Sequence, residues 1–242
     1  MNKNHIAITG ASSEIGQAIV QELQDLYPQA FFTLHCLSRP AALAAVLAQF
    51  KEHGQIVAAN FLDEQALTSF LKQIQEVDIL INAAAVTQMA ALPQLDAEAI
   101  RQMIQVNIEA FTLICQTVIP AMVAKRRGCI VNISSVAASR GNRGQTVYAG
   151  TKGYMEAFTR SLAAEYGSRG IRVNCIAPGP IQAGNLNGLL DYAAEEVKKS
   201  VALPRLGTAK DVAHLTAFLC SDKATFINGK TIGIDGGFMT GV

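Results

Sequence analysis

Short apolar runs alternate along the chain with longer stretches in which apolar residues recur at helical spacing. The short runs are apolar almost throughout, which is typical of strands that helices cover on both faces. We predict strands at His5–Thr9, Phe31–Leu37, Gln55–Ala59, Val77–Ile81, Cys129–Ile133, Arg172–Ile176 and Thr231–Ile234. We predict helices at Glu14–Leu26, Ala41–Lys51, Glu64–Ile74, Asp96–Lys125, Val147–Gly167 and Ala209–Ser221. This alternation predicts an α/β fold, a parallel sheet of about seven strands with helices on both faces.

Several helix ends carry their own signals. Asp63 and Asp96 precede helical segments and are predicted N-caps, because a carboxylate accepts the free N–H groups of a first turn. Gly54 and Gly128 stand where the preceding helices should end. The least regular stretch, residues 179–207, follows a strand end, so part of it (near 183–204) is expected to cover a substrate.

Length and charge limit the class of protein. The chain has 242 residues, half of them hydrophobic, which suits a single domain over 1–242. The formal net charge of +1 does not favour nucleic acid or a membrane surface, and the basic run Lys125-Arg126-Arg127 is interpreted as a solvated helix end. There is no secretory signal and no run of about 18 apolar residues, so we expect a cytoplasmic protein without a transmembrane helix.

Cysteine and histidine spacing argues against metal. The five cysteines are widely spaced and form no C-x-x-C, so we expect buried thiols rather than disulfides. The four histidines show no ligand spacing, and no metal site is expected.

A glycine-containing loop, Thr9-Gly-Ala-Ser-Ser-Glu-Ile-Gly16, follows the first predicted strand and opens the first helix. Gly10 would allow a tight turn, and Gly16 would allow the helix to pack closely on the strand. N–H groups at a helix start favour a pyrophosphate, although an ordinary strand-to-helix turn would look similar.

The second strand ends at Ser38-Arg39 without a carboxylate for a ribose 2′-OH. A guanidinium pairs with a 2′-phosphate, so Arg39 favours NADPH over NADH unless it is merely a surface cation.

Tyr148 and Lys152 lie four residues apart, on one face of a predicted helix. A free phenol has a pKa near 10, and a nearby cation should lower it, which suits a general acid or base in carbonyl chemistry. Ser135, at the turn after the fifth strand, is placed to hydrogen-bond the substrate oxygen. The alternative is an unrelated pair on an exposed helix face.

Together these residues resemble the short-chain dehydrogenase/reductase family over essentially the whole chain, with its Rossmann-type doubly wound sheet. The resemblance rests on Thr9–Gly16, on Asp78-Ile-Leu-Ile-Asn82 with Ala83 to Ala85, on Pro178-Gly-Pro-Ile181 and on Asp235-Gly-Gly237. It implies a catalytic tetrad of Asn107, Ser135, Tyr148 and Lys152, in which Asn107 holds a water that links Lys152 to solvent. It implies an NADP(H) site, with NAD(H) as an alternative, formed by Gly10, Ser12, Ser13, Ile15, Gly16, Ser38, Arg39, Asn60, Phe61, Asn82, Ala83, Ala84, Tyr148, Lys152, Pro178, Gly179 and Ile181.

Within this family the stretches Gly128–Ser135, Gly141–Pro178 and Leu203–Gly237 are most similar to the 3-oxoacyl-[acyl-carrier-protein] reductases. That resemblance implies an acyl carrier protein as partner, docked by Arg126 and Arg169 beside the active site. It also implies a homodimer or homotetramer formed through the two long helices. The apolar stripes on those helices are equally consistent with plain core.

The chain departs from the family pattern on the cofactor side. Glu14 replaces the middle glycine of the loop, Ser13 stands where a basic residue is common, and Asn60 replaces an aspartate that contacts adenine. Ala83, Ala85 and Ala183 replace further residues that flank the cofactor.

Three functions are compatible with this sequence. The first is an NADPH-dependent carbonyl reductase, specifically a 3-oxoacyl-[acyl-carrier-protein] reductase of fatty-acid synthesis in which Tyr148 is the general acid. The second is an NAD(P)-dependent dehydrogenase of a sugar, polyol or other secondary alcohol. The third belongs to another class, a non-catalytic NADP-binding regulatory protein, and is motivated by the altered loop.

Overall fold

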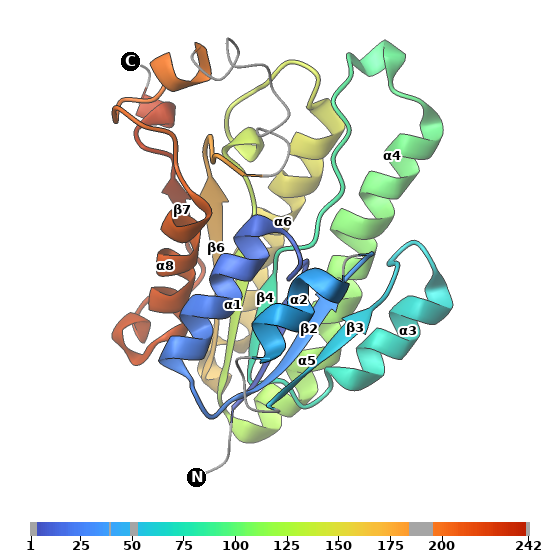
Figure 1. Ribbon diagram of the computed structural model, residues 1–242, viewed down its shortest axis with the longest axis vertical. Coiled ribbons are helices and arrows are strands. Elements are labelled where there is room, and N and C mark those ends of the chain that lie inside the picture. The colour runs from blue at the N-terminus through green and yellow to red at the C-terminus, as the bar shows by residue number, and fades with distance from the viewer. Residues whose placement is uncertain (1–3, 39, 49–52, 184–195, 241–242) are drawn as a thin grey trace.

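The computed structural model describes residues 4–38, 40–48, 53–183 and 196–240. Its centre is a parallel sheet in the order β3-β2-β1-β4-β5-β6-β7 (Figure 1). The strands are β1 (His5–Thr9), β2 (Phe31–Cys36), β3 (Gly54–Ala58), β4 (Ile79–Asn82), β5 (Gly128–Ile133), β6 (Ile171–Pro178) and β7 (Thr231–Ile234). The helices are α1 (Glu14–Leu26), α2 (Pro40–Leu47), α3 (Glu64–Gln73), α4 (Ala97–Ile104), α5 (Phe111–Lys125), α6 (Thr146–Tyr166) and α8 (Ala209–Cys220). The predicted doubly wound α/β fold is confirmed.

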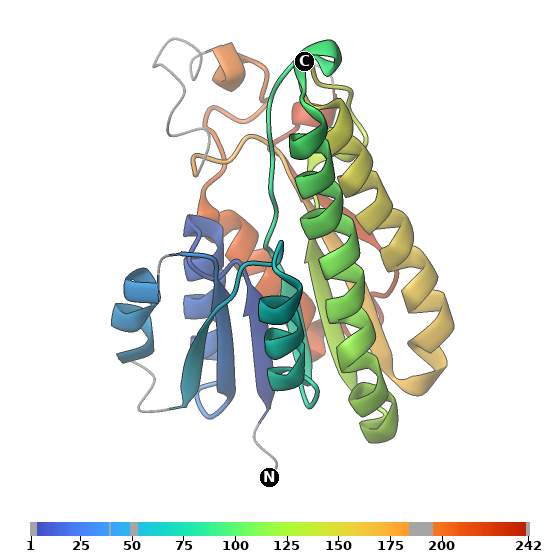
Figure 2. The same ribbon diagram turned by 90° about the vertical axis from the view of Figure 1, so that its right-hand side faces the viewer.

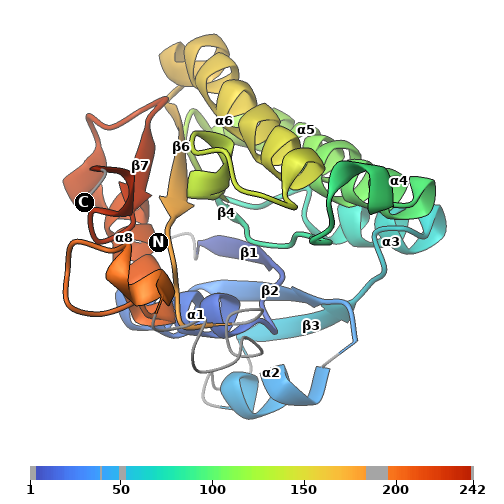
Figure 3. The same cartoon turned by 90° about the horizontal axis from the view of Figure 1, so that it is seen from above.

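Helices cover both faces of the sheet, as Figure 3 shows from above. α1, α2 and α8 lie on one face, and α3, α5 and α6 lie on the other. A hydrophobic core lies on each face of the sheet. Side chains of β1 contribute to both, because alternate side chains of a strand point to opposite faces. Ile6 and Ile8 pack with α1 and α8, whereas Ala7 belongs to the core under α3, α5 and α6. This two-sided burial explains why the strand sequences are apolar without alternation.

The predicted caps form at Asp63, which accepts hydrogen bonds from Gln65 N and Ala66 N, and at Asp96, which accepts one from Ala99 N. The prediction for the two glycines is wrong. Gly54 and Gly128 are the first residues of β3 and β5, and Arg126 takes the left-handed position after α5, with φ 50°. A Cβ at position 128 would lie 2.5 Å from Met122 Sδ, so close packing accounts for that glycine.

The predicted continuous helix over Asp96–Lys125 is interrupted. A π-helical segment, Gln105–Ala110, joins α4 to α5 and carries Asn107. Such wide turns are seldom encoded by hydrophobic spacing, and they are frequent at functional sites. Figure 2 shows this long segment running beside α6.

By length and composition alone, the segment Ala97–Lys125 is long and apolar enough to cross a membrane. Half of its most apolar window is buried inside the fold. Phe111, Ile114 and Cys115 pack in the core, and so does Met155 on α6. The apolar stripe of this segment therefore packs, at least in part, in the core of its own chain.

All five cysteines are buried thiols, as predicted.

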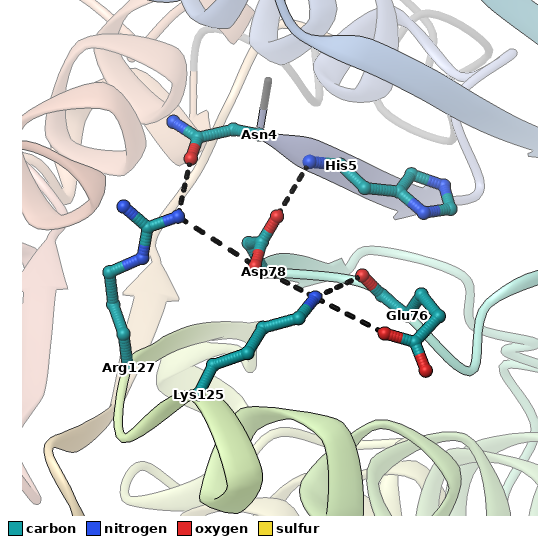
Figure 4. Close-up of polar contacts among 6 residues, drawn as sticks. All are labelled: Asn4, His5, Glu76, Asp78, Lys125 and Arg127. Carbon is teal, nitrogen blue, oxygen red and sulfur yellow. Dashed lines mark hydrogen bonds and ion pairs between the residues drawn. The ribbon is translucent and has the colours of Figure 1, made fainter. Parts of the chain in front are cut away.

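A polar cluster joins the elements at the amino edge of the sheet (Figure 4). The Asp78 carboxylate, with an 8% exposed side chain, accepts hydrogen bonds from His5 N at 2.9 Å and from Lys125 Nζ at 3.1 Å. Arg127 Nη2 lies 3.8 Å from the same carboxylate and donates to Asn4 Oδ1 at 2.9 Å. Asp78 thus connects the starts of β1, β4 and β5, at the edge opposite to the one where β4 ends in Asn82.

Replacing Asp78 with Ala should lower the free energy of unfolding by about 1–3 kcal/mol, because the His5 N–H loses its acceptor in a partly buried place. Urea denaturation measures this loss. The control is Glu76→Ala, which removes a 76% exposed carboxylate 3.4 Å from the same Lys125 amine and should cost about 0–1 kcal/mol. Equal losses in the two variants would contradict the assignment.

Candidate active site

The order of the strands reverses between β1 and β4. At such a point the connections leave the carboxyl edge in opposite directions, and a crevice forms between them. A cavity of about 180 Å³ lies there. It is lined by Gly10, Ser12, Ser13, His35, Leu37, Ala59, Asn60, Phe61, Leu62, Ala83, Ala84, Ala85, Val86 and Val106.

The loop between β1 and α1 has the geometry expected from its glycines. Gly10 has φ +67°, and a Cβ there would lie 2.8 Å from the backbone of Ala84. A Cβ on Gly16 would lie 2.7 Å from the Cα of Ala11, so this position also requires glycine. Ser13 has a role that the sequence did not suggest, since its hydroxyl caps α1 by accepting from Gly16 N at 3.0 Å. Glu14 is exposed in the first turn of α1, where a carboxylate is favourable to the helix.

Seven of the residues expected to bind cofactor line this cavity: Gly10, Ser12, Ser13, Asn60, Phe61, Ala83 and Ala84. Asn60 Oδ1 also accepts from Leu62 N at 3.0 Å. Ile15, Gly16 and Ser38 belong to the surrounding chain but do not line the cavity. Arg39 lies outside the described residues.

Asn82 lies in the interior of the sheet instead of in the cavity. It is 2% exposed, and its amide nitrogen donates to Asn132 Oδ1 at 2.9 Å. Asn132 in turn donates to Thr159 Oγ1 on α6 at 2.9 Å. Asn82 therefore joins β4 to β5 and, through Asn132, to α6. Thr9 acts on the same strand end, because its hydroxyl accepts from both Ala83 N and Ala84 N at 3.1 Å.

A second cavity, of about 550 Å³, is lined by two of the four predicted catalytic residues. Ser135 follows β5 and Tyr148 lies in the first turn of α6, and both line its wall. The remaining wall is formed by Thr87, Met89, Val136, Arg140, Asn142, Gln145, Gly179, Pro180, Ala183, Glu196, Val197, Ser200 and Phe238.

Lys152 is 2% exposed, and its amine donates to Ile133 O, at the end of β5, at 2.7 Å. This bond joins α6 to the strand that leads to Ser135. The amine lies 5.7 Å from the centroid of the Tyr148 ring. Burial lowers the pKa of Lys152 to about 8, because an ammonium loses hydration there.

The electrostatics of Tyr148 differ from the expectation. Burial raises the pKa of Tyr148 above its ordinary value, and a hydrogen bond with Ser135 opposes the shift. The prediction that Lys152 leaves this phenol with a lowered pKa is therefore wrong for the protein without ligand. The physical reason is that both groups are desolvated and the amine is directed to a backbone carbonyl. Tyr148 consequently holds its proton at neutral pH.

Asn107 lies between the two cavities and is 1% exposed. Its Oδ1 accepts from Val86 N at 2.8 Å, and its Nδ2 donates to Val86 O at 2.8 Å and to Thr151 Oγ1 at 3.1 Å. Val86 lines the first cavity and the adjacent Thr87 lines the second. The side chain of Asn107 thus fixes the segment where the cavities meet, and both hydrogens of its amide have protein partners.

The segment after β6 also reaches the second cavity. Pro178 ends β6, Gly179 lines the cavity, and Ile181 is buried beside it through a bridge to Gly207. A Cβ on Gly179 would lie 2.6 Å from Asp235 Cβ, so this glycine allows β6 and the end of β7 to approach closely.

Arg126 and Arg169 are brought together, but not beside Tyr148. Arg126 Nη2 donates to Ser168 O at 3.2 Å. Both arginines precede strand starts, at the amino edge of the sheet. Tyr148 lies near the first residue of α6 and Arg169 follows its last turn, and a helix of 21 residues is about 31 Å long. The expectation that Arg126 and Arg169 lie beside the active site of the same chain is therefore wrong.

Several lining residues were not anticipated from sequence, above all His35, Arg140, Gln145 and Phe238. Arg140 stacks on Phe238, with its guanidinium carbon 4.0 Å from the ring centroid. A histidine inside an apolar strand was the only signal for His35. Nothing local connects Arg140 to a residue almost a hundred positions later.

The residues present suit a dinucleotide. The loop 10–16 presents a capped helix start to the first cavity, where only glycine fits at its two ends. The second cavity carries Thr87, whose buried hydroxyl has no protein hydrogen-bond partner among the described residues and is available to a ligand. The two cavities adjoin at Val86 and Thr87, as a ligand with two ends requires.

Comparison with known proteins agrees with this geometry. A family profile described as Enoyl-(Acyl carrier protein) reductase matches residues 10–239. The 3-oxoacyl-[acyl-carrier-protein] reductase FabG of Haemophilus influenzae is 34% identical over 234 residues, covering 95% of this chain and 96% of that protein.

Solved structures are similar over the same length. A candidate NAD(P)-dependent gluconate 5-dehydrogenase from Beutenbergia cavernae, with NADP bound at low occupancy, has a TM-score of 0.91 at 27% identity and covers 98% of this chain and 97% of its own. An oxidoreductase of the short-chain dehydrogenase/reductase family from Burkholderia thailandensis has a TM-score of 0.88 at 28% identity and covers 100% of this chain and 94% of its own. The chain belongs to the short-chain dehydrogenase/reductase family.

Proposed function

We propose that this protein is an NADPH-dependent reductase of 3-oxoacyl thioesters carried by an acyl carrier protein. The observation that carries the proposal is that Ser135 and Tyr148 line one cavity, next to the glycine-loop cavity, while the buried amine of Lys152 lies 5.7 Å from the centroid of the Tyr148 ring. Similarity to a 3-oxoacyl-[acyl-carrier-protein] reductase over 95% of the chain supports the substrate class. From the family resemblance we also infer a cytoplasmic enzyme that acts as a homodimer or homotetramer.

The proposed chemistry assigns one task to each residue. A reduced nicotinamide, when bound, supplies the hydride that attacks the carbonyl carbon. Ser135 donates a hydrogen bond to the carbonyl oxygen, and Tyr148 delivers its proton to that oxygen. Lys152 keeps a positive charge beside the forming phenolate, and its remaining donors are available to a ribose hydroxyl. Asn107 acts indirectly, because it fixes Val86 between the cavities.

Because its pKa is raised, Tyr148 is held as the phenol, which is the form that reduction of a carbonyl uses. Reduction needs the phenol, which this environment maintains, whereas oxidation of an alcohol needs the phenolate. We also infer that the chain is one domain with a substrate-covering segment near 183–204. Of that segment, Ala183, Glu196, Val197 and Ser200 line the cavity, and residues 184–195 lie outside the described part of the chain.

A dehydrogenase of a sugar or polyol is the second candidate. The polar wall residues Arg140, Asn142 and Gln145 favour it, as does the similarity to a candidate gluconate dehydrogenase. Initial rates on acetoacetyl thioesters and on a panel of polyols and keto sugars separate the two. Faster turnover of the thioester is expected, and turnover of polyols alone would refute the first proposal.

Tyr148→Phe should lower kcat for acetoacetyl-thioester reduction by about 10²- to 10⁴-fold, because the proton donor is lost. NADPH binding and the melting temperature should remain as in the wild type. Tyr154→Phe is the matched control, since it removes a hydroxyl of the same helix that contacts Thr112 at 2.8 Å. Its kcat should be unchanged. Full activity of Tyr148→Phe would exclude the mechanism.

The reduction rate should fall as pH rises through about 8, where the buried Lys152 loses its proton. The rate should fall rather than rise because Tyr148 keeps its proton to higher pH, so the charge lost near pH 8 is that of Lys152. The measurement is kcat/KM between pH 6 and 10, with melting curves at each pH. A profile that stays level to pH 10 would show that the charge of Lys152 is not required.

NADPH should raise the melting temperature more than NADH at equal concentration, because Arg39 offers a guanidinium to the 2′-phosphate. A ligand at 100 times its Kd adds about 2.7 kcal/mol of stability. Arg39→Ala should bring the two cofactors to similar shifts. A larger shift with NADH in the wild type would contradict the proposed cofactor.

A further inference from the structure

His35 is a buried histidine that the proposed chemistry does not use. It is the next-to-last residue of β2, the strand between β1 and β3, and it is 3% exposed. Its ring stacks on Phe61, with centroids 4.0 Å apart and planes at 10°. It lines the first cavity together with Gly10 and Ala59, which follow the two neighbouring strands.

Both nitrogens of this imidazole have backbone partners. His35 Nε2 lies 2.9 Å from Ala59 O, which can only accept, so Nε2 carries the hydrogen. Nδ1 is therefore bare and accepts from Gly10 N at 3.1 Å. Burial lowers the pKa of His35 to about 4, in agreement with a neutral ring at physiological pH. The backbone adds a further bond, from Ala11 N to His35 O at 2.9 Å.

The bond to Gly10 reaches the whole loop through consecutive contacts. The Gly10 N–H donates to His35 Nδ1. The Gly10 carbonyl accepts two hydrogen bonds from Ser13, one from Oγ at 2.9 Å and one from the backbone N at 3.1 Å. The same Ser13 hydroxyl accepts from Gly16 N at 3.0 Å and caps α1. His35 is thus the first member of a chain of hydrogen bonds that ends at the start of the helix.

We propose that His35 is a positioning residue that fixes the loop 10–16 through Gly10, and so sets the affinity of this loop for the pyrophosphate of a dinucleotide. This inference rests on the proposed function. It makes the acceptor at Nδ1 the essential feature of the side chain. If His35 only filled the core, its ring volume would matter and the acceptor would not.

Three variants separate these possibilities. His35→Asn keeps an acceptor near the position of Nδ1 and loses the donor to Ala59. His35→Gln can keep the donor to Ala59 but places no acceptor near Gly10 N. His35→Phe keeps the ring and its stacking on Phe61 and loses both bonds. His5→Phe is the control, because His5 is a histidine of β1 whose ring bonds Thr33 at 2.9 Å, away from the loop.

The experiment is a fluorescence titration of each full-length variant with NADPH, followed by kcat at saturating NADPH. The Kd for NADPH should rise roughly 3- to 10-fold in His35→Gln and His35→Phe, because that ratio corresponds to the free energy of one lost hydrogen bond. It should stay within about 3-fold of the wild type in His35→Asn and be unchanged in His5→Phe. The saturated kcat should be unchanged in every variant that folds.

Equal Kd values for His35→Asn and His35→Gln, or wild-type Kd values in all variants, would overturn the inference. If His35→Phe does not fold, the comparison of Asn with Gln decides. A wild-type protein that binds no NADP(H) would instead refute the proposed function, so the two failures are distinguishable.

Discussion

The parallel direction of the strands is the constraint on which the site depends. Because every described strand runs the same way, residues that follow β1, β4, β5 and β6 meet at one edge of the sheet although they lie far apart in sequence. The reversal of strand order between β1 and β4 opens this edge. The glycine loop comes from one side of the opening and the segment 83–87 from the other, and Asn107 and Thr9 hold that segment through its backbone.

Burial then determines the chemistry of the site. Lys152 is anchored on Ile133 O, and Tyr148 is desolvated near it. A buried amine and a buried phenol each favour their neutral forms, so the resting site holds a protonated Tyr148 and an ammonium that is easily deprotonated. The proposed role of Lys152 belongs to the moment when negative charge develops on the phenol oxygen. At that stage the low dielectric strengthens the attraction between the two groups.

The sequence predicted most of this framework because the relevant signals are local. The apolar runs, the caps at Asp63 and Asp96, the glycines of the loop and the spacing of Tyr148 and Lys152 are each contained in a short segment.

The features that the sequence did not predict depend on contacts between distant segments. The π-helical turn at Asn107, the packing of Gly128 on Met122 and the pairing of His35 with Gly10 leave little trace in hydrophobic spacing. The pKa of Tyr148 was predicted with the wrong sign, because spacing reports a neighbouring charge but not the burial of both groups. Arg126 and Arg169 were misplaced for a different reason. That expectation rested on the family resemblance alone, whereas the predicted helix Val147–Gly167 already separates Tyr148 from Arg169.

A crystal structure of the complex with NADP⁺ and a 3-oxoacyl thioester tests the central claim most directly. The account predicts the pyrophosphate at the start of α1, the chain of the cofactor passing Val86, and the nicotinamide and the substrate carbonyl between Ser135 and Tyr148. A cofactor bound with its nicotinamide away from Tyr148, or at the amino edge of the sheet, would contradict it.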